Sequence, residues 1–384
     1  MSNVSSSNGL EKCPKLRFKG FSEPWVVMKL SDYSAFLPGL TYAPTDVKND
    51  GLLVLRSSNI QNGQLSFLDN VYVDTEIVPN RIRTKEKDVL MCVRNGSKAL
   101  VGKTALITSE YADLAWGAFM TVLRPKRHNT FLFQYLNSSS FKTQVFPDLD
   151  TATVKQITMG TLNGVHIYVP SLPEQEKIAF FLQWIDARIE KQHNLIETLK
   201  KYKRGAVKRI FANKGDWAKY KISDIAHIAT GHSNTQDKAE DGAFPFFIRS
   251  QTVARSNRYL YDGEAVLTIG DGQIGKVFHY YVGKFDCHQR VYMMTQFKNT
   301  TGKYFYHYFA SFFYDRVIRM SAKNTVDSVR YDMIAEMPIY IPSPETQQKI
   351  VKALDLLDAR ITTAESLLDL YEKEKNALLQ KMFI

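Results

Sequence analysis

The spacing of apolar residues singles out two segments of the chain, residues 170–211 and residues 342–383. In each segment, apolar residues recur at alternating intervals of four and three positions, which is typical of a coiled-coil helix. Eight of ten spaced positions are apolar in the first segment and nine of ten in the second, and prolines occur only at the start of each. We therefore expect two unbroken helices of about 38 residues, each about 57 Å long.

These apolar positions would form the seam between the two helices. Lys203 and Lys375 interrupt the seam at the same step, where they would fix the register or extend along their aliphatic stems to solvent. The alternative is a pair of independent amphipathic helices on separate domains. The seam residues are Ile178, Leu182, Ile185, Ile189, Ile196 and Leu199 in the first segment, and Ile350, Leu354, Leu357, Ile361, Leu368 and Tyr371 in the second.

The two helical segments are also copies of each other. At a shift of 172 positions, 14 of 42 residues are identical without a gap. The identical blocks include Asp186-Ala187-Arg188-Ile189 and Asp358-Ala359-Arg360-Ile361. A repeat of this length indicates a molecule built as two copies of one plan.

The regions before the two helices share a frame as well. The stretch from Trp25 to Asp32 resembles the stretch from Trp217 to Asp224, at a shift of 192. Runs of β-branched and aromatic residues punctuated by Gly, Asn and Asp predict short strands, with helical windows at residues 131–141 and 304–320. We expect an α+β fold in five parts: a loose tail (1–16), a first domain (17–169), a first helix (170–213), a second domain (214–341) and a second helix (342–384).

The order of these parts constrains their geometry. The second domain joins the end of one helix to the start of the other, and a domain of its size is about 35–40 Å across. Parallel helices would hold those two ends about 57 Å apart. We therefore expect an antiparallel coiled coil with one domain at each end and an approximate two-fold axis.

The charge of the chain indicates a polyanionic partner, because the net charge is +11 and the pI is near 9.3. The first helix region, residues 174–214, carries a net +5 and the second, residues 345–384, a net −1, which leaves +7 elsewhere. Two similar basic domains related by an approximate two-fold axis would suit duplex DNA that is recognised at two separated sites, with the base pairs between them not contacted. A solvated basic surface is the alternative.

Motifs for catalysis are scarce. Residues 270–276 satisfy GxGxxG and nearly satisfy the phosphate-binding loop, but Val277 replaces the hydroxyl residue that would bind magnesium. The residues that follow read as a strand, which favours a hairpin turn over a nucleotide site. No amino-methylation motif, nuclease carboxylate cluster or nucleophile elbow occurs. We expect neither a catalytic site nor a bound cofactor in this chain.

The cysteines and the apolar runs bear on the cellular setting. Cys13, Cys92 and Cys287 form no metal spacing, and Cys287 with His288 and His279 lacks a fourth ligand, so we expect no metal. Few, scattered cysteines favour a reduced, cytoplasmic location. No apolar run reaches the length of about 18 residues that spans a membrane, and no signal peptide is recognisable.

Long polar side chains recur between the predicted strands of both domains. Arg and Lys suit guanine edges, Asn and Gln suit adenine edges, and all of them can bind phosphates. For a single residue a solvated loop explains the pattern equally well. The candidate DNA-binding residues are Arg56, Ser57, Asn59, Arg94, Asn95, Lys98 and Lys103 in the first domain, and Arg249, Ser250, Gln251, Arg255, Asn257, Arg258, Gln273, Lys276, His288, Gln289 and Arg290 in the second.

These features together resemble the specificity subunit of type I restriction–modification systems. The resemblance is carried by the paired Asp-Ala-Arg-Ile helices, the two Trp-led domain starts, and the segments 55–60 and 285–290, and it covers the chain after its tail. It implies two target recognition domains that each read half of a bipartite sequence, with the helices as spacer. It also implies two modification subunits that methylate adenine with S-adenosylmethionine, and restriction subunits that use ATP and Mg.

The resemblance suggests where partner subunits dock, and two alternative functions remain open. Arg188 and Arg360 are candidates for docking the partners, unless they pair with the neighbouring Asp186 and Asp358. The two helices begin differently after their prolines, which would make the two partner contacts unequal. One rival is a stand-alone DNA-binding regulator, and a second is a nucleotide-binding enzyme that uses Gly270 to Lys276.

Overall fold

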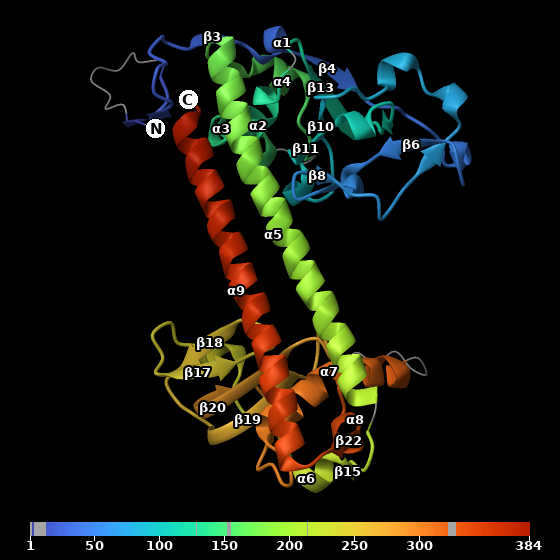
Figure 1. Cartoon of the computed structure of the whole chain (residues 1–384), viewed down its shortest axis with the longest axis vertical. Coiled ribbons are helices and arrows are strands. Elements are labelled where there is room, and N and C mark those ends of the chain that lie inside the picture. Colours follow the sequence, from blue (N-terminus) through green and yellow to red (C-terminus); the bar gives the residue numbers. More distant parts are fainter. Residues whose placement is uncertain (1, 4–12, 128, 152–154, 213, 322–327) are drawn as a thin grey trace. The chain divides into compact units, whose positions relative to one another are not determined.

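The chain forms two compact units in the computed structural model (Figure 1). The structure describes residues 2–3, 13–127, 129–151, 155–212, 214–321 and 328–384. Unit 1 comprises Met1–His193 with Ser366–Ile384, and unit 2 comprises Asn194–Glu365. Each unit thus takes one half of each long helix, whereas the five predicted parts follow sequence order. Most of the predicted tail, residues 4–12, lies outside the described residues.

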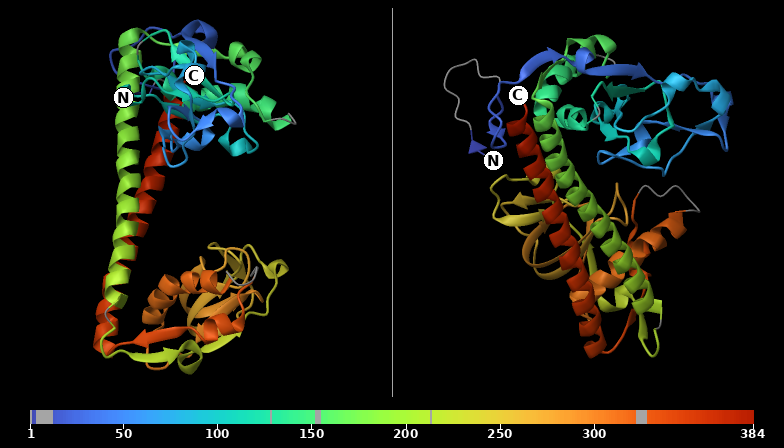
Figure 2. Two further views of the ribbon diagram at one scale, coloured as in Figure 1. Left: turned by 90° about the vertical axis from the view of Figure 1, so that its right-hand side faces the viewer. Right: turned by 45° about the horizontal axis from the view of Figure 1, so that its top comes forward.

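Two long helices, α5 (Leu172–Ala212) and α9 (Pro344–Met382), match the repeated segments. Prolines occupy only their first turns, where a missing N–H costs no hydrogen bond, and Glu174 and Glu345 place acidic charge at the helix starts. Every predicted seam residue is buried or half-buried. Figure 2 shows the two helices side by side.

Ion pairs set the direction and register of the helix pair within each unit. As the residue number rises along one helix it falls along the other, so the helices run antiparallel within each unit. Both seam lysines fix the register, because each one pairs with an aspartate of the opposite helix. The pairs are Lys375 with Asp186 and His193 with Glu372 in unit 1, and Lys203 with Asp358 and Lys200 with Glu365 in unit 2.

Unit 1 is built from short strands and helices around two four-stranded sheets, ordered β11-β10-β13-β4 and β12-β6-β9-β5. Hairpin β7-β8 and the pairs β1-β2 and β3-β14 complete it. Its elements are β1 (Ser2–Asn3), β2 (Leu16–Arg17), β3 (Val26–Lys29), α1 (Leu30–Tyr33), β4 (Ser34–Pro38), β5 (Val47–Lys48), β6 (Leu52–Leu55), β7 (Ile60–Gln61), β8 (Gln64–Leu65), β9 (Tyr72–Val73), β10 (Val89–Cys92), β11 (Thr104–Leu106), β12 (Ala115–Trp116), β13 (Met120–Pro125), α2 (Phe131–Asn137), α3 (Ser139–Thr151), α4 (Met159–Gly164) and β14 (His166–Val169).

Unit 2 repeats this plan with one continuous six-stranded sheet, ordered β16-β21-β19-β20-β17-β18. The long strand β20 joins β19 at one end to β17 at the other, where unit 1 has the separate strands β11 and β12. Its elements are β15 (Ala218–Lys221), α6 (Ile222–Ile225), β16 (His227–Thr230), β17 (Phe244–Phe247), β18 (Val253–Ser256), β19 (Tyr261–Ile269), β20 (Phe278–Cys287), β21 (Val291–Thr295), α7 (Gly302–Ser321), α8 (Tyr331–Ala335) and β22 (Pro338–Ile341). This architecture confirms the predicted α+β fold with a long helix after each domain.

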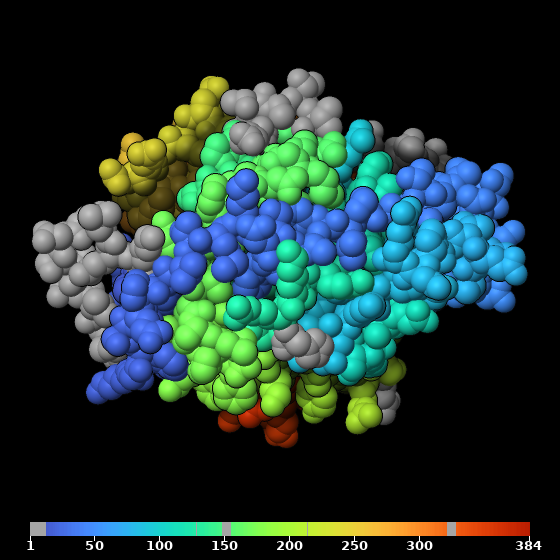
Figure 3. Space-filling view, turned by 90° about the horizontal axis from the view of Figure 1, so that it is seen from above, coloured from blue at the N-terminus to red at the C-terminus, as the bar shows by residue number. Residues whose placement is uncertain are grey.

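The N-terminal segment of unit 1 is tied to the start of α5. The Arg17 guanidinium donates from Nε to Glu174 Oε1 at 2.7 Å and from Nη2 to Oε2 at 2.8 Å, and both side chains are buried. The Phe18 ring meets the Phe181 ring edge-on at 5.7 Å. In Figure 3 the blue N-terminal residues lie directly against the green start of α5. Residues 16–18 are therefore part of the packed unit.

The last turn of each long helix completes the core of a unit. Phe383 is buried among the rings of Trp25, Phe131 and Tyr135 in unit 1. Phe211, 172 positions earlier, is buried in unit 2 among the rings of Trp217, Tyr304, Tyr308 and Phe312. The end of α9 thus supplies Phe383 to the core of unit 1, and the end of α5 supplies Phe211 to the core of unit 2.

A buried histidine links the domain core of unit 2 to both long helices. His307 on α7 contacts Asp355 at 2.8 Å through Nε2 and lies 3.8 Å from Asp358, which is paired with Lys203, while Lys303 also pairs with Asp355. Burial lowers the pKa of His307 despite the two carboxylates, which raise it. At the matching place in unit 1, Gln134 Nε2 donates to Asp186 at 2.8 Å.

This histidine is expected to make unit 2 less stable in mild acid. Its pKa is lower in the folded state than in the unfolded chain, where it is about 6.5. The unfolded chain therefore binds more protons as the pH falls below about 6.5, and stability is lost until the folded pKa is passed. His307→Gln, which copies Gln134, should remove part of this loss between pH 7.5 and 5.5 in urea unfolding of unit 2. An unchanged pH dependence would assign the loss to His279 and His288, whose pKa values are lowered too.

Candidate nucleic-acid interface

Three loops of unit 1 meet where strands β6 and β12 end. These two strands are parallel, so their carboxyl ends lie at one edge, and Gly117 N donates to Leu55 O at 3.0 Å. The loop after β10 joins them, because Asn95 Nδ2 donates to Ser57 Oγ at 3.1 Å. The Arg94 guanidinium stacks over the Phe119 ring at 5.2 Å. We call Arg56, Ser57, Arg94, Asn95 and Phe119 the unit 1 edge.

Four loops of unit 2 meet in a similar way where parallel strands β17 and β20 end. His288 N donates to Phe247 O at 3.0 Å, and Arg249 pairs with Asp271 at 3.1 Å. Gln289 Nε2 donates to Asn234 Oδ1, which brings in the loop after β16. We call Asn234, Arg249, Arg258, Gln289 and Arg290 the unit 2 edge.

Several backbone hydrogen bonds around the two edges correspond in position. Met120 N donates to Gly117 O in unit 1 as Val291 N donates to His288 O in unit 2, both at 2.8 Å. The isolated bridges Arg94 to Gln156 and Asp271 to Ser328 also occupy matching places. The two domains therefore present different side chains from one backbone frame.

Glycines allow the chain just after β4 and just after β16 to approach this frame. A Cβ atom at Gly39 would lie 2.0 Å from Gly117 O, and one at Gly231 would lie 1.9 Å from Cys287 O. Both distances are shorter than any real Cβ contact, so neither position accepts a side chain without a backbone shift. The close approach lets Leu40 N donate to Trp116 O at 2.7 Å and Ser233 N to Cys287 O at 3.2 Å.

A buried carboxylate organises the unit 2 edge from below. Asp286 is 1% exposed and accepts hydrogen bonds from Ser233 Oγ and Ser256 Oγ at 2.8–2.9 Å and from Cys287 N at 2.8 Å. Arg258 supplies the nearest positive charge, with Nε 3.5 Å from Asp286 Oδ2 and Nη2 donating to Ser233 Oγ. The carboxylate thereby ties loops from three strands together, which stiffens the surface above it.

The histidine of this edge is held in its neutral form. His288 is buried, and its Nδ1 accepts a hydrogen bond from Arg290 N at 3.0 Å. Burial lowers the pKa of His288, and the nearby Arg249 and Arg290 lower it further. Burial raises the pKa of the neighbouring Cys287 thiol. Both residues act as supports for the loop rather than as exposed contacts.

The structure brings only some of the candidate residues to the edges. Asn59 is fully buried, because its side chain accepts from Arg56 N and donates to Ser66 O, so we remove it from the interface. Arg255 donates to Gly242 O and Ala243 O within its own hairpin. Lys276 lies over the Tyr314 ring. The remaining candidates are exposed or half-buried: Lys98, Lys103, Ser250, Gln251, Asn257 and Gln273.

Sequence reasoning missed Phe119 and Asn234. Phe119 is 57% exposed between the buried residues Trp116 and Met120, and a search for polar groups passes over an aromatic residue. Asn234 belongs to a loop far from Gln289 in the chain. No pattern in the sequence marks Phe119 as exposed, because its neighbours in the chain are apolar or small.

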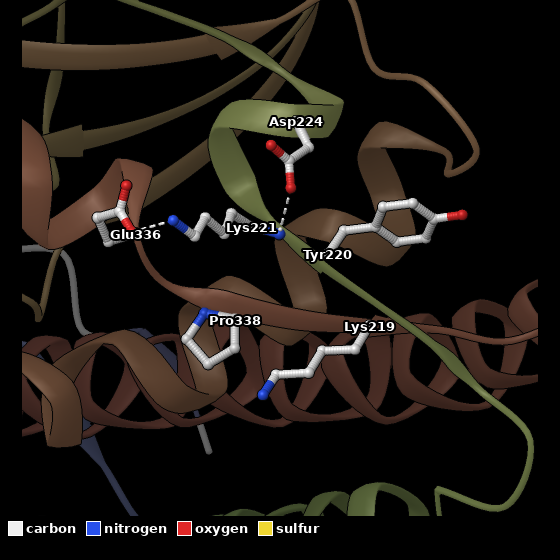
Figure 4. Close-up of a pocket in the computed structure, with 6 residues that line it drawn as sticks. All are labelled: Lys219, Tyr220, Lys221, Asp224, Glu336 and Pro338. Carbon is white, nitrogen blue, oxygen red and sulfur yellow. Dashed lines mark hydrogen bonds and ion pairs between the residues drawn. The ribbon is translucent and has the colours of Figure 1, made fainter.

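A shallow pocket of about 360 Å³ lies beside the first strand of unit 2. Figure 4 shows Lys221 reaching Glu336, with which it forms an ion pair at 2.6 Å, while Lys221 N donates to Asp224. Lys219 lies over the Tyr340 ring at 5.9 Å. The cations of this pocket are therefore engaged, and none of its residues belongs to either edge.

The sequence also predicted that the chain has no metal site, no nucleotide site and no membrane span. No cluster of three or more metal-ligating side chains occurs among the described residues. Residues 270–277 form the turn between the antiparallel strands β19 and β20, so no helix follows the glycines as a nucleotide site requires. Across the described part of the chain, every helix is too short or too polar to cross a lipid bilayer.

Comparison with known proteins places this fold. The family model for the type I restriction modification DNA specificity domain matches residues 22–201 and 214–370. The specificity subunit of the type I restriction enzyme EcoKI from Escherichia coli K12 is 27% identical over 195 residues, which cover 48% of this chain and 42% of that protein. The StySPI specificity subunit from Salmonella potsdam is 25% identical over the same coverage. The match thus spans less than half the length of these curated relatives.

Solved structures support the same architecture. A type I restriction–modification S subunit from M. genitalium superposes with a TM-score of 0.64 at 16% identity, over 97% of this chain and 99% of that one. A structure described for complex assembly and conformational transition of the type I R-M system gives 0.54 at 15% identity, over 94% and 97%. At these identities the likeness concerns the fold alone. Because the family model covers both domains and most of both helices, the chain belongs to the family of type I restriction–modification DNA specificity domains.

Proposed function

We propose that this chain is the DNA-binding specificity subunit of a type I restriction–modification complex, and that each unit reads one half of a bipartite target. The observation that carries the proposal is the pair of matched edges. One backbone frame occurs twice and carries different polar side chains, as two readers of different sequences would. The chain itself is non-catalytic in this proposal. Modification subunits would supply S-adenosylmethionine chemistry, and restriction subunits would supply ATP- and Mg-dependent cleavage.

The duplicated helix pair supports a role as a fixed spacer. Ion pairs between the two helices set their register within each unit, so we expect the half-sites to be separated by a constant number of base pairs. We expect the middle of the target to be unread, because the recognition loops lie on the domains rather than along the helices.

Mapping N6-methyladenine tests the function directly. The chain is co-expressed with its modification subunit in cells that lack other adenine methyltransferases, and the methylated positions are sequenced. We expect one bipartite motif with a spacer of constant length. A continuous motif would contradict the proposal, and sequence-specific DNA binding by a chain that forms no complex would favour a stand-alone regulator.

We further propose that the modification subunits dock on the outward faces of the two long helices, unequally. Phe180 is 73% exposed and Trp184 60% exposed one turn apart on α5, and large exposed aromatic residues are typical of binding hot spots. The positions 172 residues later are Lys352 and Leu356, which form a less apolar face. Arg188 borders the first face, 6.0 Å from the Trp184 ring.

The two docking arginines differ as well. Arg188 donates to Tyr371 Oη at 2.6 Å and stacks on that ring at 4.2 Å, rather than pairing with Asp186. Arg360 makes no hydrogen bond or ion pair with a described residue. An arginine already held in place loses less conformational freedom on binding. This difference also favours tighter docking at α5.

Trp184→Ala is expected to weaken binding of the first modification subunit about 30-fold, because truncating a hot-spot tryptophan costs about 2 kcal/mol. Leu356→Ala is the matched control on α9 and should affect only the second, weaker association. Titration calorimetry or native mass spectrometry separates the two steps. Equal losses for both variants would contradict unequal docking.

A further inference from the structure

The loop tips at the two edges occupy one structural position with different chemistry. Three backbone hydrogen bonds close each loop: Gly117 N to Leu55 O, Met120 N to Gly117 O and Val93 N to Phe119 O in unit 1. Their counterparts in unit 2 are His288 N to Phe247 O, Val291 N to His288 O and Gly270 N to Arg290 O. The two residues inside each closed loop are therefore equivalent, Ala118-Phe119 to Gln289-Arg290.

Both tips are exposed although the residues beside them are buried. Phe119 is 57% exposed, and Trp116 and Met120 on either side are at most 1% exposed. Gln289 and Arg290 are exposed, and Cys287 and Val291 are fully buried. The core thus holds each tip rigidly and makes no use of its side chains.

The tips are also preorganised. Arg94 stacks on the Phe119 ring at 5.2 Å and restrains it from one side. In unit 2, His288 Nδ1 fixes the backbone of Arg290 at 3.0 Å, and Gln289 is held by Asn234. The Arg290 guanidinium makes no hydrogen bond or ion pair with a described residue, so its donors are available to a ligand.

We propose that these tips determine the base preference of each unit at one position of its half-site, with Phe119 favouring thymine and Arg290 favouring guanine. A free guanidinium matches the O6 and N7 acceptors of guanine in two hydrogen bonds. An aromatic side chain offers no hydrogen bond and gains by contact with the thymine methyl group. The inference rests on the proposed function and names the chemistry by which the two halves of the target differ.

Reciprocal substitutions test the proposal in the assembled modification complex. Phe119→Arg and Arg290→Phe are compared with the unaltered chain by selection from duplexes in which each base of the target is randomised. We expect Phe119→Arg to shift one position of one half-site from thymine to guanine, by at least about tenfold in the ratio of the two bases. Arg290→Phe should shift one position of the other half-site in the opposite direction.

Two further variants separate base reading from other roles. Arg290→Lys should keep the guanine preference with weaker binding, because lysine retains a donor but lacks the two-pronged geometry. Arg94→Ala removes the stacking partner and should weaken the thymine preference without creating one for guanine. Thermal unfolding should be unchanged in Phe119→Arg and Arg290→Phe, since both side chains are exposed.

The outcomes distinguish this inference from the proposed function. If the unaltered complex selects a bipartite target but the reciprocal variants lose binding equally for all sequences, the tips contact phosphates and the inference is wrong. Shifts that fall in the same half-site, or no shift at all, overturn it as well. If the unaltered complex selects no bipartite target, the proposed function itself fails and takes the inference with it.

Discussion

Replacing Phe383 by alanine should destabilise unit 1 by about 3–4 kcal/mol, although the residue lies more than 200 positions from most of that unit. The ring is 6% exposed and packs against Phe131 at 5.3 Å, Tyr135 at 6.1 Å and Trp25 at 6.4 Å. Removing a buried phenyl group leaves a cavity lined by three aromatic rings, which cannot close without moving α2 and β3. The loss should therefore fall within the usual range of about 3–5 kcal/mol for truncating a buried phenylalanine.

Hydrogen exchange followed by mass spectrometry measures the loss of stability in each unit separately. Phe383→Ala should speed exchange in β3, α2 and the start of α5, and leave unit 2 unchanged. Phe211→Ala is the matched control, because this ring fills the same place in unit 2, with Tyr308 at 5.2 Å and Phe312 at 5.4 Å. It should produce the reverse pattern. If either variant raises exchange equally in both units, then Phe383 and Phe211 do not each stabilise only one unit.

Glu174→Ala is expected to cost about 3–5 kcal/mol, because it leaves the Arg17 guanidinium buried without its carboxylate. Both Nε and Nη2 of Arg17 donate to Glu174, and the two side chains are 5% and 1% exposed. Glu174 raises the pKa of Arg17 through its hydrogen bond, against the effect of burial. Without Glu174 the guanidinium still stays charged, because an arginine side chain is too basic to lose its proton in a protein. An unpaired buried charge is far more costly than an unpaired exposed one.

Two comparisons make this test specific. Arg17→Met with Glu174→Leu replaces the pair by apolar groups and should recover much of the loss, as buried ion pairs often allow. Thr346→Ala changes the equivalent first-turn position of α9, where no such pair exists, and should cost less than 1 kcal/mol. Urea unfolding of the three variants and the unaltered chain measures the differences. A double variant less stable than Glu174→Ala alone would show that the pair contributes through geometry rather than charge.

The helices and the duplicated frame were predictable from sequence because both depend on patterns that repeat at a fixed step. The seam follows from a spacing of four and three, and Lys203 and Lys375 stand out as its shared interruptions. Their partners could not be predicted, since Asp358 and Asp186 come opposite them only at the register that the antiparallel helices adopt. The same pairing places the second half of α9 in unit 1 and the second half of α5 in unit 2, a division that sequence order alone does not indicate.

The candidate interface was predictable in part. Residue type located Arg94, Arg249, Gln289 and Arg290, which lie in loops at strand ends. It failed for Asn59, because the sequence does not distinguish a buried asparagine that hydrogen-bonds to backbone groups of a turn from an exposed asparagine that contacts DNA. It also passed over Phe119, whose significance depends on the matching hydrogen bonds of the two domains rather than on its own chemistry.

The use of residues 366–384 by unit 1 sets the order in which the chain folds during synthesis. Unit 2 has all its residues once residue 365 has left the ribosome, but unit 1 must wait for Phe383. At about 5–20 residues per second, the 190 residues from His193 to Phe383 take about 10 to 40 seconds to synthesise, and residues 1–193 lack this partner throughout. During that time Ile178 and Leu182 of α5 lack Leu379 and Met382, the α9 members of their core cluster, so we expect the second domain to fold before the first.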